Sequence, residues 1–182
     1  MQSPDLARDG CTEEFSTSWV ETHIPAGTEI VAQDDVAFDE YIVLRGHLVS
    51  TICDPEGKEI CVGFHVGPGV VTPNIARTRS GRSLVSIRAT SDAQIARINT
   101  NDLTQLMIST TPIRDWANGI LREELGRKAD REWCLASLGG ADRLTWFRES
   151  YPGYEDVFNH ALIASFLGIT PVTLSRLRHS DR

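Results

Sequence analysis

The chain has 182 residues, of which 41% are hydrophobic, and a formal net charge of −7. This composition is ordinary for a soluble globular protein. We find no apolar run long enough to cross a membrane, and the N-terminus is polar and acidic rather than signal-like, so we expect a cytoplasmic protein with no membrane segment.

The charge is unevenly distributed along the chain. From residue 141 onward five Arg balance five Asp or Glu, so residues 1–140 carry the whole net charge of −7. Such a surface argues against indiscriminate nucleic-acid binding. A neutral C-terminal end with arginines on its last helix can still meet phosphates.

The cysteines show no CxxC or Cys/His metal-binding spacing; they are Cys11, Cys53, Cys61 and Cys134. Cys53 and Cys61 flank the turn at Glu56-Gly57 almost symmetrically, which places them on neighbouring strands. We expect them to be reduced, small core residues, and a disulfide or sensor pair is the alternative.

Short apolar segments separated by turn residues follow a polar lead-in over residues 1–18, which we expect to be irregular or briefly helical. The expected strands are 29–32, 40–45, 47–53, 58–64, 83–88 and 93–98. Asp54-Pro-Glu-Gly57 has proline and glycine in turn-forming positions and predicts a hairpin. Turns at such regular intervals favour an all-β barrel or roll.

Helical patterning begins near Asn101, which we predict to be the N-cap of a helix over 102–107. A long helix is predicted over 112–138, with Gly119 and Gly126 in its interior. The i,i+4 pairs Glu123–Arg127 and Glu124–Lys128 are interpreted as a solvated face. The length of this helix suits a dimer seam, and the alternative is packing on its own β domain.

A short helix over 141–150 and a turn at 151–153 precede two apolar-periodic segments between residues 160 and 182. Gly168 ends the first segment, and Thr170 and Pro171 start the second as N-cap and first helical residue. Ala164 lets the two helices approach, and Leu174 fills the angle between them. The pattern fits a helix-turn-helix, with any helical hairpin as the alternative.

This order of elements resembles the Crp/Fnr (cyclic-AMP receptor protein-like) superfamily of bacterial transcription regulators. The resemblance covers about residues 20–180 and rests on five motifs, namely His23-Ile-Pro-Ala-Gly27, Tyr41-Ile-Val-Leu-Arg-Gly46, the hairpin 54–59, Arg82-Ser83 and Ala161 to Arg178. It implies an α+β fold with a double-stranded β-helix (jelly roll). The implied domains are a sensor of residues 1–111, a dimerisation helix of 112–138 and a DNA-binding helix-turn-helix of 139–182.

Departures from the family concern the effector. Members that bind cyclic nucleotides carry a Gly-Glu pair before a short phosphate-cradling helix, whereas this chain has Gly69-Val-Val-Thr-Pro-Asn74 with no acid. The resemblance implies an effector site at Arg82 and Ser83 with Thr72 and Asn74. No cofactor is expected, although a small anionic effector or a cyclic nucleotide remains open. Arg77, Arg79 and Arg82 would favour an anion, or they are solvated loop arginines.

Other family features are also missing from the sequence. An Fnr-type iron–sulfur site needs a cysteine cluster that the chain lacks. Haem ligation through a histidine stays open, and the alternative is that the histidines are structural. The family's winged element has no counterpart in His179 to Arg182, which shortens the expected DNA-contact surface.

The resemblance assigns DNA-reading roles to the second helix of the pair. Arg176 is expected to read a guanine through a bidentate contact. Val172 and Thr173 are expected to contact a thymine methyl or a base edge. Ser175 and Arg178 are expected to contact the DNA backbone, and Thr170 lies at the start of the helix. The implied partners are double-stranded DNA, a second copy of the chain and RNA polymerase.

Two other functions stay open from the sequence. One is a cyclic-nucleotide-type regulatory or adaptor domain that acts on a protein partner. The other is a cupin-like metal enzyme, which needs a His-x-His pair that the chain lacks. The expectation is therefore a regulator rather than an enzyme, with no catalytic residue and no metal ligand.

Overall fold

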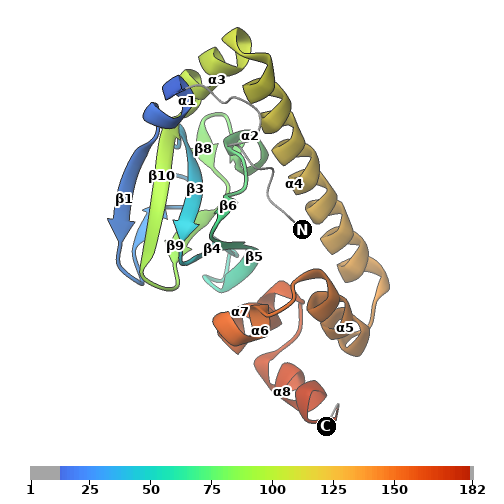
Figure 1. The fold of residues 1–182 in the computed structure, drawn as a ribbon. Coiled ribbons are helices and arrows are strands. Elements are labelled where there is room, and N and C mark those ends of the chain that lie inside the picture. The colour runs from blue at the N-terminus through green and yellow to red at the C-terminus, as the bar shows by residue number, and fades with distance from the viewer. Residues whose placement is uncertain (1–12, 181–182) are drawn as a thin grey trace. The chain divides into compact units, whose positions relative to one another are not determined.

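The computed structural model describes residues 13–180 (Figure 1). Its contacts divide the chain into two compact units. The first unit takes in the described residues up to Ser50 together with Phe64–Leu125, and the second takes in Thr51–Gly63 and the described residues from Gly126 onward. Each unit is described by itself below.

Short strands make up most of the chain between residues 20 and 99, as the turn spacing predicted. They are β1 (Val20–Ile24), β2 (Glu29–Val31), β3 (Asp39–Arg45), β4 (His47–Cys53), β5 (Glu59–Val66), β6 (Gly69–Val70), β7 (Thr78–Arg79), β8 (Arg82–Ser83), β9 (Ser86–Ala89) and β10 (Ala93–Asn99). We call β1–β10 the sheet domain. The single strand predicted over 83–88 is wrong, because the chain forms two strands, β8 and β9, with a break between them.

The sheet domain has two four-stranded sheets, with strand orders β1-β10-β3-β6 and β2-β9-β4-β5, and β7 and β8 form a separate two-stranded sheet. Antiparallel pairing joins β10 to both β1 and β3. The step from β3 to β4 depends on Gly46, which has φ +88° and where a Cβ would come 2.5 Å from the Asp92 carbonyl oxygen. Only glycine fits this turn, since both the backbone angle and the space exclude a side chain.

The helices are α1 (Glu13–Thr17), α2 (Asn74–Arg77), α3 (Thr100–Ser109), α4 (Thr111–Ser137), α5 (Gly140–Ser150), α6 (Tyr154–Val157), α7 (His160–Phe166) and α8 (Pro171–Ser180). The long helix predicted over 112–138 is present as α4. The predicted cap of α3 at Asn101 is wrong, because Asn99 is the N-cap and its side chain accepts from the Asn101 amide at 2.9 Å. Helix α6 was not predicted from the sequence.

No single helix among residues 13–180 is long and apolar enough to span a membrane, although α7 and α8 together would meet the requirement by length and composition alone.

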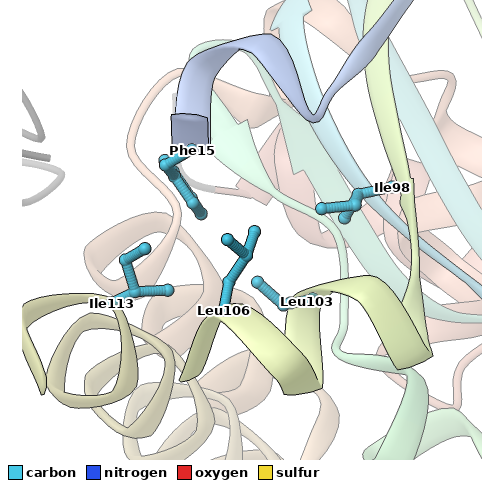
Figure 2. Packing of buried hydrophobic residues seen from close by; sticks show 5 residues of the cluster. All are labelled: Phe15, Ile98, Leu103, Leu106 and Ile113. Atoms are coloured by element: carbon cyan, nitrogen blue, oxygen red, sulfur yellow. The ribbon is translucent and has the colours of Figure 1, made fainter. Parts of the chain in front are cut away.

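One core cluster joins α1, α3 and α4 to the end of β10. Figure 2 shows its buried side chains, Phe15, Ile98, Leu103, Leu106 and Ile113. Trp19 and Trp116 pack edge-on against the Phe15 ring, with ring centroids 5.8 and 5.4 Å away. This cluster anchors the N-terminal part of the long helix to the sheet domain within the first unit.

A second, aromatic cluster lies in the second unit between α5 and α7. Phe147 and Phe166 are both buried, with ring centroids 5.9 Å apart, and Tyr151 packs against both rings. Aromatic pairs at these separations stabilise a core beyond the area they bury. The cluster packs α5 against α7, the first helix of the pair α7–α8.

Candidate functional site

The turn between α7 and α8 has the geometry expected from Gly168. This glycine has φ +65°, its amide donates to the Ser165 carbonyl at 3.1 Å, and the Ile169 amide donates to the Ala164 carbonyl at 3.0 Å. These two bonds are a Schellman motif, which satisfies the last carbonyls of a helix. The axes of α7 and α8 are bent by 101° relative to each other across this turn.

Helix α8 starts and packs as predicted. The Thr170 hydroxyl accepts from the Thr173 amide at 3.1 Å, which makes Thr170 the N-cap before Pro171. Leu174 and Ala164 are both fully buried, so the small residue and the aliphatic residue lie inside the pair. The predicted pattern of small residue, glycine and aliphatic residue is confirmed as a packed helix pair.

Two arginines from outside the pair satisfy the carbonyls at the C-terminal end of α7. Arg143 of α5 donates to the Leu167 carbonyl at 3.0 Å and also to Leu135 and Leu138 at the end of α4, both at 2.9 Å. Arg131 of α4 donates to the Phe166 carbonyl at 3.0 Å, and its guanidinium lies 4.5 Å from the centroid of that ring. Cations at helix C-termini are favourable, and these two fix α7 to the end of α4.

The outward face of α8 presents several of the side chains predicted to read DNA. Val172, Ser175 and Arg176 are exposed, Val172 to 60%. Thr173 is half-buried, and its hydroxyl lies 2.9 Å from that of Thr170. An exposed row of this kind on the second helix of a bent pair is available to a macromolecular partner.

Arg178, further along α8, is half-buried and contacts an acidic side chain of the second unit. Its Nε lies 3.1 Å from Glu155 Oε1 as an ion pair, although Oε1 accepts no hydrogen bond. The other carboxyl oxygen of Glu155 accepts from Arg148 Nε at 2.7 Å. Sequence reasoning missed Glu155 because it lies on the unpredicted helix α6, and no spacing rule pairs it with Arg178.

The tip of the β4–β5 hairpin belongs to the second unit with the helix pair. The Cys61 amide donates to the Ser165 hydroxyl of α7 at 3.0 Å. Cys61 is buried and free, and burial raises the pKa of its thiol to about 12. Cys53 is exposed, so its prediction as a core residue is wrong; it is the last residue of β4. Cys11 lies outside the described residues.

Thr72, predicted to touch an effector, is buried and makes a contact within the chain. Its hydroxyl donates to Glu124 Oε1 of α4 at 2.8 Å. The interpretation of Glu124 as part of a solvated face is therefore wrong, because this side chain is only 6% exposed. An i,i+4 spacing shows which residues share a helix face but not whether that face is covered.

Arg82 and Ser83, where the resemblance places the phosphate contact, also have internal partners. The Ser83 hydroxyl is fully buried and donates to the Val85 carbonyl at 2.6 Å. Arg82 is exposed, and its Nη1 donates to the Asp34 carbonyl at 2.6 Å. The two side chains therefore do not converge on one external anion.

The fourth predicted effector residue, Asn74, is the first residue of the short helix α2. Its side-chain amide donates to the Ala37 carbonyl at 2.9 Å, and its backbone amide donates to both carboxyl oxygens of Glu40, at 3.0 and 2.9 Å. Glu40 is buried, and desolvation raises the pKa of its carboxyl, although the Asn74 amide and Arg77 act in the opposite direction. Glu40 thus occupies the N-terminus of the helix that cradles phosphate in the resemblance.

Arg77 ends α2 and is buried rather than solvated. Its Nε donates to the Thr72 carbonyl at 3.0 Å, Nη2 donates to the Asp39 carbonyl, and the guanidinium lies 5.4 Å from the Tyr41 ring centroid. Desolvation lowers the pKa of this guanidinium. The interpretation of Arg77 as a solvated loop arginine is wrong, while Arg79 is exposed as that interpretation expects.

Within the part of the chain that the structure describes, no three His, Cys, Asp or Glu side chains lie close enough together to hold a metal ion. Buried His65 instead pairs with a serine, since its Nε2 lies 2.8 Å from Ser50 Oγ.

The comparisons with known proteins agree with this architecture. Residues 21–110 match the family model of the cyclic nucleotide-binding domain. The sheet domain and the long helix share their fold with the solved structures described next. No protein among the curated sequences matches the chain.

Three solved structures illustrate the likeness. FixK2 from Bradyrhizobium japonicum has a TM-score of 0.77 at 19% identity, covering 89% of this chain and 83% of that one. The c-di-GMP responsive global regulator CLP from Xanthomonas campestris has a TM-score of 0.72 at 17% identity, covering 92% and 88%. A CooA mutant from Carboxydothermus hydrogenoformans has a TM-score of 0.80 at 14% identity, covering 99% and 84%. At such identities the likeness establishes the fold alone.

The cyclic nucleotide that the matched domain family implies does not fit the residues present. The segment from Gly69 to Asn74, where the resemblance places the ribose-binding acid, contains no Asp or Glu. At the N-terminus of α2, the backbone amide of Asn74 already donates to the Glu40 carboxylate. A nucleotide phosphate placed there would meet a carboxyl group.

Proposed function

We propose that this protein is a DNA-binding transcription regulator that acts as a homodimer on a two-fold operator. The observation that carries the proposal is the pair α7–α8. It combines a 101° bend, a glycine turn, a buried Leu174 and an outward row of Val172, Ser175 and Arg176. A helix-turn-helix joins its helices at about 90–120°, and its second helix enters the major groove.

Arg176 is the base-reading side chain in this proposal. It is exposed on the outer face of α8, in the middle of the helix. Arginine pairs with the O6 and N7 atoms of guanine through two parallel hydrogen bonds. Val172, at the first turn of the helix, offers an apolar surface to a thymine methyl.

The second half of the proposal is pairing of two copies along α4, which takes in nearly all of the predicted dimerisation helix of residues 112–138. Apart from the adjoining backbone of α4, no atom of residues 13–180 lies within 4 Å of a Cβ built at Gly119 or Gly126, so no packing among these residues requires either glycine. Leu125 and Trp133 on the same helix are exposed to 55% and 57%. A second copy of α4 would cover these apolar side chains and use the glycines for close approach.

The sheet domain in this proposal does not hold a cyclic nucleotide in the family's usual way. Thr72, Asn74 and Ser83 are buried and bonded within the chain, and Arg82 donates to a backbone carbonyl. A small anionic effector would therefore have to displace internal contacts, and regulation without any effector is consistent with the same geometry.

The test is selection of bound duplexes from a random pool, with and without cyclic AMP and cyclic GMP. We expect enrichment of an inverted repeat whose half-sites lie about one helical turn apart, and the same site under all conditions. Absence of any enriched sequence would overturn DNA reading and favour a domain that acts on a protein partner. Enrichment only with a cyclic nucleotide would overturn the statement about the sheet domain.

A further inference from the structure

Glu155 lies between two arginines of the second unit. Its Oε2 accepts from Arg148 Nε of α5 at 2.7 Å, and its Oε1 lies 3.1 Å from Arg178 Nε of α8. The Glu155 side chain is 18% exposed, against 36% and 33% for the side chains of Arg148 and Arg178. It is therefore more shielded than either arginine, which strengthens both ion pairs relative to pairs at an open surface.

The two ends of the Arg178 guanidinium have different surroundings. The Nε edge faces Glu155, whereas Nη1 lies 3.0 Å from the Nδ1 atom of His160 and also contacts its Nε2. His160 is the first residue of α7 and is exposed. The Nη end of Arg178 is thus directed to the start of the first helix of the pair.

That position has a meaning in a helix-turn-helix bound to DNA. The first helix crosses the phosphate backbone while the second lies in the groove. A guanidinium at the start of the first helix therefore lies where phosphate oxygens pass. Two arginines and one carboxylate also leave one net positive charge in the triad, so Glu155 orients Arg178 without cancelling its attraction for phosphate.

We propose that Glu155 is a positioning residue for DNA, which holds Arg178 through Nε so that its Nη groups donate to a backbone phosphate. The inference rests on the proposed function and adds a residue to it. It makes an unusual prediction, since removal of an acidic charge from a DNA-binding surface ordinarily strengthens binding. In this protein, removal of the Glu155 charge is expected to weaken DNA binding.

The experiment measures the affinity of the full chain for its selected duplex between 50 and 200 mM salt. Loss of one phosphate contact lowers the slope of log affinity against log salt concentration by about 0.9. The fold-loss of affinity between 50 and 200 mM salt is therefore expected to be about 3.5 times smaller for Arg178→Ala than for the wild type. Glu155→Gln is expected to bind more weakly than the wild type and to show part of the same flattening. In a protein that already carries Arg178→Ala, Glu155→Gln is expected to cause no further loss of affinity for the duplex.

Glu149→Gln is the matched control, because Glu149 is an exposed acid of the neighbouring helix α5 and the change in charge is the same. It is expected to leave the salt slope unchanged and to bind as well as the wild type or better. If Glu155→Gln behaves like this control, or weakens binding with an unchanged slope, the inference is overturned.

The outcomes also separate this inference from the proposed function. A wild type that selects no duplex overturns both. A wild type that selects a duplex, with an unchanged salt slope in Arg178→Ala, overturns only the inference and leaves DNA reading in place. Because Arg178 is partly exposed, its alanine variant keeps the test decisive even where Glu155→Gln fails to fold.

Discussion

The surroundings of α2 and the outer face of α8 carry similar residues and use them differently. Around α2 the side chains of Thr72, Asn74 and Ser83 are buried, and each has a hydrogen-bond partner within the chain. On α8 the side chains of Ser175 and Arg176 face outward. Buried polar groups are nearly always paired. Residue type therefore does not separate a ligand site from a structural hydrogen-bond network, whereas burial does.

The largest expected effect is a loss of folding stability that distinguishes the buried face of α8 from its exposed face. Leu174 is fully buried between the helices, so Leu174→Ala should lower the free energy of unfolding by about 2–5 kcal/mol through lost burial and a cavity. Denaturant unfolding followed by circular dichroism measures this change. Val172→Ala, on the exposed face, is the control and should leave stability within about 0.5 kcal/mol. Equal losses in the two variants would contradict the packing of the pair.

The next effect concerns base reading by the outer face. Arg176→Ala should lower discrimination at one base position by about 1–3 kcal/mol, because a bidentate contact with guanine is removed. Competition binding with duplexes altered at each position measures the loss. Arg82→Ala is the control from the sheet domain and should leave base preference unchanged. An Arg176→Ala protein with unaltered affinity and preference would contradict the proposed function.

The parts of the fold that the sequence predicted are those controlled by local chemistry. The turn at Gly168, the cap at Thr170 and the long helix each follow from residue preferences within a few positions. The cap of α3 shows the limit, because Asn99 and Asn101 have the same preference and only the tertiary context selects Asn99. Helix α6 has four residues, too few for any period to show.

The candidate site was harder to predict because its contacts join residues far apart in the sequence. Thr72 and Glu124, or Glu155 and Arg178, are brought together by packing, and neither pair has a sequence spacing that suggests contact. Arg77 illustrates the consequence. In the sequence it is one of three neighbouring arginines, and in the structure it is the buried one.

A smaller effect tests the internal network around α2. Thr72→Val keeps the shape of the side chain but removes the hydroxyl that donates to Glu124. A buried oxygen that loses a donor costs about 1–3 kcal/mol, so the free energy of unfolding should fall by that amount. Thr104→Val, on the exposed surface of α3, is the control with little expected change. If Thr72→Val leaves the free energy of unfolding unchanged, the hydroxyl of Thr72 is not needed for stability and is available to an effector.

The smallest effect is a pH dependence that arises from Glu40. A carboxyl whose pKa is raised in the folded state stabilises the fold below its unfolded pKa and loses that contribution as the pH rises through the folded value. Desolvation raises the pKa of Glu40 above the ordinary 4.5, and Asp39 adds to this while the Asn74 amide and Arg77 oppose it. The wild type should therefore lose stability relative to Glu40→Gln as the pH rises from 4.5 through the raised pKa.

Paired denaturant titrations of wild type and Glu40→Gln between pH 4 and 8 measure this difference. Glutamine keeps an oxygen that accepts from the Asn74 amide, so the comparison isolates the charge rather than the hydrogen bond. Glu123→Gln, at an exposed acid of α4, is the matched control for the change in side-chain type. If the wild type instead gains stability relative to Glu40→Gln as the pH rises, the Asn74 amide and Arg77 outweigh desolvation in setting the pKa of Glu40. Glu40 would then act as a fixed internal anion at the place where the family holds a phosphate.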